Sequence, residues 1–331
     1  MQPERFAIVG AGAWGTALAQ AAASAGRVVT LIGRDAEVVD EINVRRTNSR
    51  FLGPQELSAA ITATTAQDVG AADAVILAVP AQASRLALGS LTGLGDRKPV
   101  ILSAKGLEQK TLLRQSEVLH AMAPLAVPFV LSGPSFAADV AAGRPTAVTL
   151  AGDDASDTSD LCAALAGPTF RPYAADDRIG VELAGALKNI YAIASGAVEG
   201  AELGASARAA LIARAFAEMG RLVAAMGGSA STLTGLSGLG DLTLTCTSGQ
   251  SRNYRFGRAL GSGLSTSEIE LRSPEMLAEG VRTAPVALAI ARQYHVDAPL
   301  IEAVNLLLAG TLPIGDIVAG LMTRPLKREE S

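Results

Sequence analysis

Short apolar runs alternate with helix-like patterns through the first half of the chain. Each run is bounded by glycine, proline or polar residues, and amphipathic spacing fills most of the intervals. Strands that alternate with helices predict a parallel, doubly wound α/β sheet with right-handed crossovers. The predicted strands are Phe6–Val9, Val28–Ile32, Ala74–Val79, Val100–Leu102, Phe129–Leu131 and Ala147–Leu150.

The pattern changes after about Asp177, where helical spacing continues with almost no strand signal. We therefore expect an α/β domain at residues 1–177 and an all-α domain at residues 178–331. A chain of 331 residues is long enough to form two hydrophobic cores. Because no low-complexity linker separates the two halves, we expect the domains to share a firm interface with a cleft between them. The clearest helical segments are Val181–Val198, Ala207–Met226, Glu275–Tyr294 and Leu300–Leu308.

The composition is that of a compact globular protein. Apolar residues make up 49% of the chain, charged residues 18%, and the net charge is −4, which excludes a disordered chain and a basic nucleic-acid-coating protein. Two cysteines, Cys162 and Cys246, exclude a disulfide framework and a four-cysteine zinc site. Two histidines at unrelated positions argue against histidine-rich metal catalysis. We expect no metal and a reducing, cytoplasmic location.

No apolar stretch reaches the roughly 18 to 20 residues that span a bilayer, so no membrane span is expected. Phe6–Ala25 resembles a signal peptide, because it is apolar behind a lone Arg5. The glycine spacing in this segment explains the same residues better. Gly10, Gly12 and Gly15 follow a predicted strand and open a helix, as in a Rossmann-type dinucleotide-binding turn.

The end of the second predicted strand bears on the choice of cofactor. Arg34 favours the 2′-phosphate of NADP over NAD, whereas a carboxylate there would bind the ribose 2′-hydroxyl of NAD. Asp35 follows directly, and capping of the next helix is the alternative explanation for it. Trp14, the only tryptophan, lies inside the glycine turn. It either covers the cofactor or packs in the core beneath the turn.

Two further turns follow predicted strands at the sheet edge where doubly wound proteins bind ligands. Lys105 follows the predicted strand that ends at Leu102. It either contacts a phosphate or carbonyl group of a ligand or is a solvated loop lysine. Gly133 and Ser135 follow another predicted strand, where backbone amides and a hydroxyl can bind an anion or simply cap a helix.

Only five of the 28 basic residues are lysines, and Lys188 lies in an otherwise apolar helical pattern. A desolvated lysine titrates nearer neutrality and can exchange a proton, whereas a lysine reaching solvent would not. Asp241 follows a glycine-dense turn. Further along, Ser251, Arg252 and Asn253 can together bind one phosphate. Cys246 is expected to be a packing residue rather than a nucleophile, since no histidine is nearby in sequence.

These motifs, in this order and over nearly the whole chain, resemble the bacterial-type NAD(P)-dependent glycerol-3-phosphate dehydrogenase family. The resemblance rests on residues 10–18, 104–106, 133–137, 182–189, 235–241, 244–248, 251–253 and 278–280. It implies reversible hydride transfer between the cofactor and glycerol 3-phosphate or dihydroxyacetone phosphate, a supply of glycerol 3-phosphate for phospholipid synthesis, a cytoplasmic location and a homodimer.

The resemblance also assigns site residues. Lys188 corresponds to the proton-transferring lysine, and Asp241 would orient it or a substrate hydroxyl. Gly33 and Leu277 depart from residues common in the family. The implied substrate contacts are Lys105, Gly133, Ser135, Lys188, Asp241, Ser251, Arg252 and Asn253, and the implied cofactor contacts are Gly10, Gly12, Ala13, Trp14, Gly15, Arg34, Lys105, Ala137, Arg252, Leu277 and Glu279.

Two other functions remain open from the sequence. One is a two-domain dehydrogenase that acts on a β-hydroxy acid and binds a carboxylate instead of a phosphate. The other is a redox-sensing module that binds NADPH without turning over a substrate. The cluster at residues 251–253 favours a phosphorylated substrate, and a proton-active lysine favours an enzyme.

Overall fold

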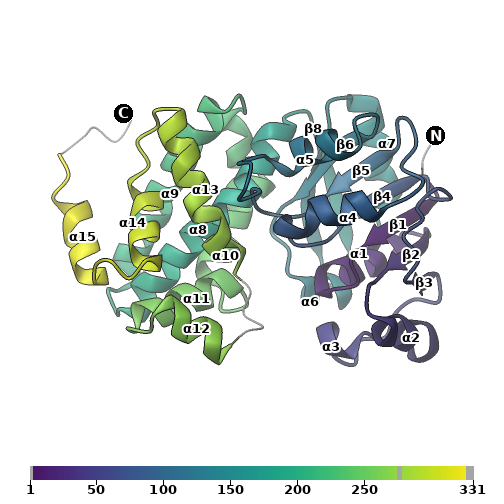
Figure 1. Ribbon diagram of the computed structural model, residues 1–331, viewed down its shortest axis with the longest axis horizontal. Coiled ribbons are helices and arrows are strands. Elements are labelled where there is room, and N and C mark those ends of the chain that lie inside the picture. The colour runs from purple at the N-terminus through teal and green to yellow at the C-terminus, as the bar shows by residue number, and fades with distance from the viewer. Residues whose placement is uncertain (1–2, 274–277, 326–331) are drawn as a thin grey trace.

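A computed structural model of the chain describes residues 3–273 and 278–325. The chain forms two lobes that lie side by side, a sheet flanked by helices and a bundle of helices (Figure 1). The last described helix, α15 (Ile314–Met322), lies at the outer end of the helical lobe, away from the sheet. This arrangement confirms the predicted fold class, an α/β lobe followed by an all-α lobe.

The sheet has eight strands in the order β3-β2-β1-β4-β5-β6-β7-β8. The first six follow the order of a dinucleotide-binding sheet, with the switch point between β1 and β4. Successive residues of each central strand point into two different cores: Ile8 packs against α1, and Val9 lies in the core on the other face. The strands are β1 Arg5–Val9, β2 Val28–Ile32, β3 Ile61–Thr64, β4 Ala74–Leu77, β5 Pro99–Leu102, β6 Val127–Ser132, β7 Thr146–Ala151 and β8 Phe170–Ala175.

The expectation of an all-parallel sheet was wrong at one pair, because β6 and β7 are antiparallel. The helix between them, α6, spans only Ala137–Ala141. Five helical residues advance about 7.5 Å, whereas a six-residue strand covers about 20 Å. The connection therefore does not carry the chain back along β6, and β7 returns beside it in the opposite direction.

The sequence patterns did not predict the two edge strands. β3 has only four residues and alternates apolar with exposed or half-buried threonine positions. β8 carries Arg171 and Pro172, which sequence reasoning disfavours in a strand, although proline is tolerated at a sheet edge. The other helices of the sheet lobe are α1 Ala13–Ser24, α2 Ala36–Arg45, α3 Ser49–Leu52, η1 Ala81–Ala83, α4 Ser84–Ser90, α5 Gln115–Met122 and α7 Ala155–Leu165.

Helix α8, Arg178–Gly200, is the central element of the helical lobe and is buried along most of its length. It begins three residues after β8 ends, and no strand follows it among the residues that are described. None of the described helices is both long and apolar enough to cross a membrane. The remaining elements are α9 Ala205–Ala225, η2 Ala230–Thr234, η3 Leu236–Gly240, α10 Asp241–Thr247, α11 Arg252–Gly261, α12 Thr266–Arg272, α13 Glu279–Gln293, α14 Pro299–Leu308 and α15 Ile314–Met322.

Close packing of α8 against α11 sets the geometry of the site described below. A side chain at Gly257 would place its Cβ 1.9 Å from the carbonyl oxygen of Ile193, and one at Gly196 would lie 2.0 Å from that of Tyr254. Only glycine allows the two backbones to approach this closely. Helix α11 is thereby held against the C-terminal half of α8.

Candidate functional site

A fully buried carboxylate joins the two lobes at the proposed catalytic position. Asp241, at the start of α10, is 0% exposed. Its Oδ2 accepts a hydrogen bond of 2.7 Å from Lys105 Nζ, which comes from the loop after β5. Its Oδ1 accepts one from Lys188 Nζ on α8, and Lys188 also donates to Thr245 Oγ1 at 2.8 Å. One carboxylate thus places two ammonium groups side by side.

Burial and neighbouring charges shift the pKa values of Lys188 and Asp241. Burial lowers the pKa of Lys188 to about 8; Asp241 opposes the shift and Lys105 adds to it. Burial alone would raise the pKa of Asp241, but the nearby charges of Lys105 and Lys188 outweigh it and lower that pKa. At neutral pH the carboxylate is therefore ionised, while Lys188 is poised to exchange a proton.

The two lysines differ in exposure and in partners. The Lys188 side chain is 8% exposed and that of Lys105 is 16% exposed. Lys105 Nζ also donates to the carbonyl oxygen of Gly133 at 3.0 Å, and Ser135 Oγ donates to the same oxygen. The turn after β6 thus lies beside the lysine cluster, and binding of a substrate by Gly133 and Ser135 stays a prediction.

A chain of side-chain amides fixes the backbone around the lysines. Asn189 Nδ2 donates to the carbonyl oxygen of Lys105 at 3.0 Å, and Asn189 Oδ1 accepts from Asn253 Nδ2 at 2.9 Å. Asn253 Oδ1 in turn accepts from the backbone N–H of Gly280. Both asparagines are buried, so these bonds hold α8, α11 and α13 in register around Lys188.

The neighbours of Asn253 have different surroundings. Ser251 is buried, and its Oγ caps α11 by accepting from the backbone N–H of Tyr254. Arg252 is exposed and makes no hydrogen bond or ion pair within the described part of the chain. An unpaired guanidinium at a helix N-terminus beside the lysine cluster can bind an anionic group.

A cavity of about 420 Å³ opens at the switch point of the sheet, where the glycine turn was predicted to bind a dinucleotide. Gly10 and Gly12 line it. A Cβ added at Gly12 would meet no atom within 4 Å, so the loop presents open space where a pyrophosphate can approach. The residues here fit the phosphates of a dinucleotide at the start of α1.

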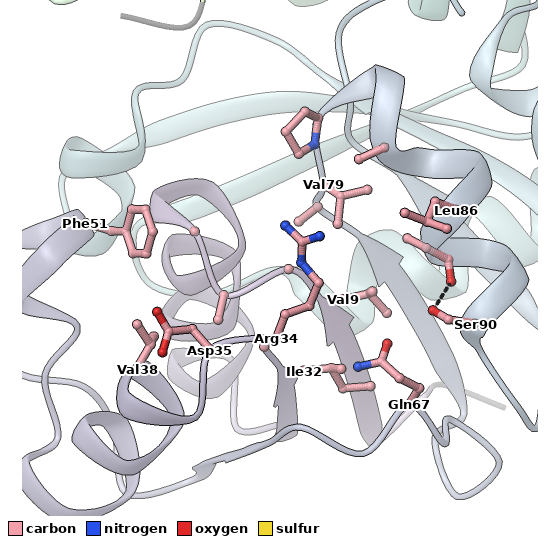
Figure 2. A pocket seen from close by; sticks show the side chains of 18 of the residues that line it. Val9, Ile32, Arg34, Asp35, Val38, Phe51, Gln67, Val79, Leu86 and Ser90 are labelled. Carbon is pink, nitrogen blue, oxygen red and sulfur yellow. Dashed lines mark hydrogen bonds between the residues drawn. The ribbon is translucent and has the colours of Figure 1, made fainter. Parts of the chain in front are cut away.

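Arg34 extends over this cavity toward Val79, with Asp35 and Phe51 on one side and Leu86 and Ser90 on the other (Figure 2). Arg34 is exposed and forms no hydrogen bond or ion pair with any residue that the structure describes. Asp35 caps α2, because its Oδ1 accepts from the backbone N–H of Glu37 at 3.0 Å. The alternative explanation of Asp35 as a helix cap is thus observed.

Four predicted cofactor residues lie at or near the glycine turn but do not line the cavity: Ala13, Trp14, Gly15 and Ala137. Trp14 is half-buried and packs against the core of the sheet lobe, and its Nε1 is buried without a hydrogen-bond partner. Gly15 packs directly on Gly10. Both hypotheses for Trp14 remain compatible with its half-buried position.

Glu279 lies between the cavity and the lysine cluster. Its Oε1 accepts from the backbone N–H of Ala81, the residue after cavity-lining Pro80. Its Oε2 lies 3.9 Å from the position of a Cβ on Gly106, next to Lys105. Leu277, the other predicted residue of this segment, lies outside the described residues.

Sequence reasoning missed three side chains of these sites. Thr245 and Asn189 lie within the quoted motifs but received no role, and only the folded arrangement of α8, α10 and α11 shows what they contact. Arg50, which lines the cavity, carried no signal in the sequence. Burial raises the pKa of the Cys246 thiol to about 12, which disfavours the thiolate, as expected of a packing residue. Within residues 3–273 and 278–325, no three His, Cys, Asp or Glu side chains are grouped so as to hold a metal.

Comparisons with known proteins agree along the whole chain. Residues 5–158 match the family described as NAD-dependent glycerol-3-phosphate dehydrogenase N-terminus, and residues 177–319 match the corresponding C-terminus. The chain is 49% identical to the glycerol-3-phosphate dehydrogenase (NAD(P)+) of Parvibaculum lavamentivorans, covering 98% of both chains, and 49% identical to that of Brucella canis, covering 98% and 99%. A crystal structure of glycerol-3-phosphate dehydrogenase from Coxiella burnetii is 38% identical, with a TM-score of 0.89 over 97% of this chain and 99% of that chain.

Proposed function

The chain belongs to the NAD-dependent glycerol-3-phosphate dehydrogenase family, and on this premise we propose that Lys188 is the proton donor of its reaction. The protein is an oxidoreductase that interconverts glycerol 3-phosphate and dihydroxyacetone phosphate with a nicotinamide cofactor. One observation carries the assignment of Lys188. Two lysines from different lobes share the buried carboxylate of Asp241, and Lys188 is the more deeply buried of the two, which lowers its pKa to about 8.

A bound nicotinamide cofactor supplies the hydride that reaches the carbonyl carbon of dihydroxyacetone phosphate. Negative charge then develops on the carbonyl oxygen of the substrate, and protonated Lys188 stabilises that oxygen and donates its proton. In the reverse direction neutral Lys188 accepts the proton of the C2 hydroxyl. Burial lowers the pKa of this lysine, and Asp241 keeps the lysine in place and limits that shift.

Lys105 acts as an electrostatic clamp rather than as the acid. It is more exposed than Lys188 and divides its bonds between Asp241 and the carbonyl oxygen of Gly133. An ammonium group that lies nearer to solvent is suited to attract an anionic substrate, whereas a desolvated lysine is suited to release a proton. The backbone of Gly133 and the hydroxyl of Ser135 complete this side of the substrate site.

The substrate phosphate binds at the start of α11. The guanidinium of Arg252 is free to pair with it, and Ser251 and Asn253 lie on either side of this arginine. Since Asn253 is bonded to Asn189 beside Lys188, a phosphate bound there lies close to the proton donor. Binding energy from the phosphate thus orients the reacting carbonyl.

NADPH is the favoured cofactor, since Arg34 presents an unpaired guanidinium at the end of β2. Gly10, Gly12, Ala13 and Gly15 would hold the pyrophosphate. The further cofactor contacts expected are Trp14, Lys105, Ala137, Arg252, Leu277 and Glu279.

The broader cellular assignments are also proposals. The chain divides into a dinucleotide-binding domain at 1–177 and a catalytic domain at 178–331, and it forms a homodimer in the cytoplasm. It supplies glycerol 3-phosphate for phospholipid synthesis, without a metal ion.

One assay separates this function from the two alternatives. Oxidation of NADPH is followed with dihydroxyacetone phosphate and, in parallel, with β-keto acids. Turnover of the phosphorylated ketone alone is expected. Preference for a β-keto acid would assign a β-hydroxy acid dehydrogenase, and binding of NADPH without turnover of any of these compounds would assign a sensor.

A further inference from the structure

A short segment after α2 forms one rim of the nucleotide cavity and is firmly anchored. Asn48 is 0% exposed, and its Nδ2 donates to the carbonyl oxygen of Ala11 at 3.0 Å and to Thr16 Oγ1 at 2.8 Å. Glu41 on α2 accepts from the backbone N–H of Ser49 at 2.8 Å. The segment is thus bound both to the glycine turn and to α2, so the backbone that carries Arg50 is held at the cavity.

Arg50 lies in this segment and lines the cavity together with Arg34. Its Nη1 lies 3.1 Å from Asp35 Oδ2, and its guanidinium stands over the ring of Phe51, 5.4 Å from the centroid. The other oxygen of Asp35 accepts from the backbone N–H of Glu37. Both oxygens of this carboxylate are therefore engaged, one by the helix cap and one by Arg50.

Whether the Asp35 carboxylate is paired affects nucleotide binding, because Asp35 follows Arg34 directly. A carboxylate near the end of the second strand can accept a hydrogen bond from the ribose 2′-hydroxyl of NAD, and it repels a 2′-phosphate. With Arg50 in place, the rim carries two positive charges and one paired negative charge. Without Arg50, a free carboxylate would stand beside the one remaining arginine.

We propose that Arg50 determines cofactor specificity by neutralising Asp35, so that the cavity selects a nucleotide with a 2′-phosphate. This inference rests on the proposed use of NADPH, and it assigns to Arg50 a role that Arg34 does not fill alone. An exposed ion pair adds little to folding stability. The pair acts instead on nucleotide binding. Arg50 neutralises a carboxylate that would otherwise repel a 2′-phosphate and bind the 2′-hydroxyl of NAD.

The test is a double-mutant cycle read first by binding. The dissociation constants of NADPH and NADH are measured by calorimetry for the wild type, Arg50→Ala, Asp35→Asn and the double variant, and kcat/KM is measured for both cofactors. Asparagine is an effective helix cap, so Asp35→Asn retains the start of α2. Arg50→Ala is expected to lower the preference for NADPH over NADH by about tenfold, chiefly by weakening NADPH. In the Asp35→Asn background the same change is expected to alter the preference by less than about twofold.

Arg5→Ala is the matched control. Arg5 pairs with Asp73 at 3.2 Å, and the two side chains are 61% and 34% exposed. The corresponding values for Arg50 and Asp35 are 67% and 45%. Neither Arg5 nor Asp73 lines the cavity, so the cofactor preference of Arg5→Ala should equal that of the wild type.

Three results would overturn the proposal: an unchanged preference in Arg50→Ala, an equal weakening of both cofactors, or the same loss of preference in the Asp35→Asn background. The last would show that Arg50 contacts the nucleotide directly. Failure of the proposed function is a separate observation, because it requires that the wild type itself not turn over dihydroxyacetone phosphate or not prefer NADPH.

Discussion

Replacing Asp241 by asparagine removes the charge that holds both site lysines while nearly preserving the shape of the side chain. Asp241 is fully buried and bonded to Lys105 and Lys188. Its negative charge raises the pKa of Lys188 against the larger effect of burial, and Lys105 lowers it further. In Asp241→Asn, burial and Lys105 act without opposition, so the pKa of Lys188 must fall below its present value of about 8.

An opposite charge in contact shifts a pKa by about 1 to 3 units. On the proposed role of Lys188 as proton donor, reduction of dihydroxyacetone phosphate needs its protonated form. The rate is then retained at low pH and falls as the pH rises through the pKa of this lysine. In the variant we expect that fall to occur about 1 to 3 pH units lower. The variant should also lose roughly 3 kcal/mol of unfolding free energy at neutral pH, because breaking a buried pair leaves an uncompensated charge.

The assay is kcat/KM for the reduction between about pH 4 and 10, a range that covers the pKa expected in the wild type and in the variant. Chemical denaturation at pH 7 and pH 9, values on either side of the pKa of about 8, gives the stability. The stability loss should be smaller at the higher pH, where neutral Lys188 needs no counter-charge. An alkaline limb that does not move, in a variant that is folded and binds NADPH, would refute the electrostatic coupling of Asp241 to Lys188.

Three further expectations concern single side chains. Arg34→Ala should weaken NADPH by about ten- to a hundredfold and spare NADH, since a charge-assisted contact is lost; equal losses would mean that Arg34 only shapes the loop. Binding of NADPH should quench Trp14, the sole indole, and an unchanged emission spectrum at saturation would place it in the core alone. Arg252→Ala should raise KM for dihydroxyacetone phosphate by about ten- to a hundredfold. The unphosphorylated ketone is the control, and a similar loss with that compound would show that Arg252 does not bind the phosphate.

Local sequence patterns singled out the glycine turn that lines the cavity and the buried lysine that binds Asp241. The glycine spacing depends only on backbone approach within one strand, turn and helix. Lys188 was conspicuous because a lysine in an apolar helix is costly to bury without a purpose. Both features can be recognised without knowledge of the tertiary structure.

The remaining features depend on contacts between distant segments. Lys105 and Asp241 are 136 residues apart, and no pattern in either segment predicts that they share a hydrogen bond. Strand β7 runs antiparallel to β6 because the connection between them contains only the five-residue helix α6. Arg50 lies in a four-residue helix with no motif, and its place at the cavity follows from the anchoring of Asn48.

The central claim, that Lys188 rather than Lys105 donates the proton, is tested most directly by comparing two conservative variants. Arginine can replace a charge but does not release a proton near neutral pH. Turnover of dihydroxyacetone phosphate is measured at saturating NADPH for Lys188→Arg and Lys105→Arg, with NADPH affinity as the check on folding. Lys188→Arg is expected to lose about 10² to 10⁴ in kcat while still binding NADPH, and Lys105→Arg to change mainly KM. Turnover that survives in Lys188→Arg and collapses in Lys105→Arg would contradict the account and assign the proton to Lys105.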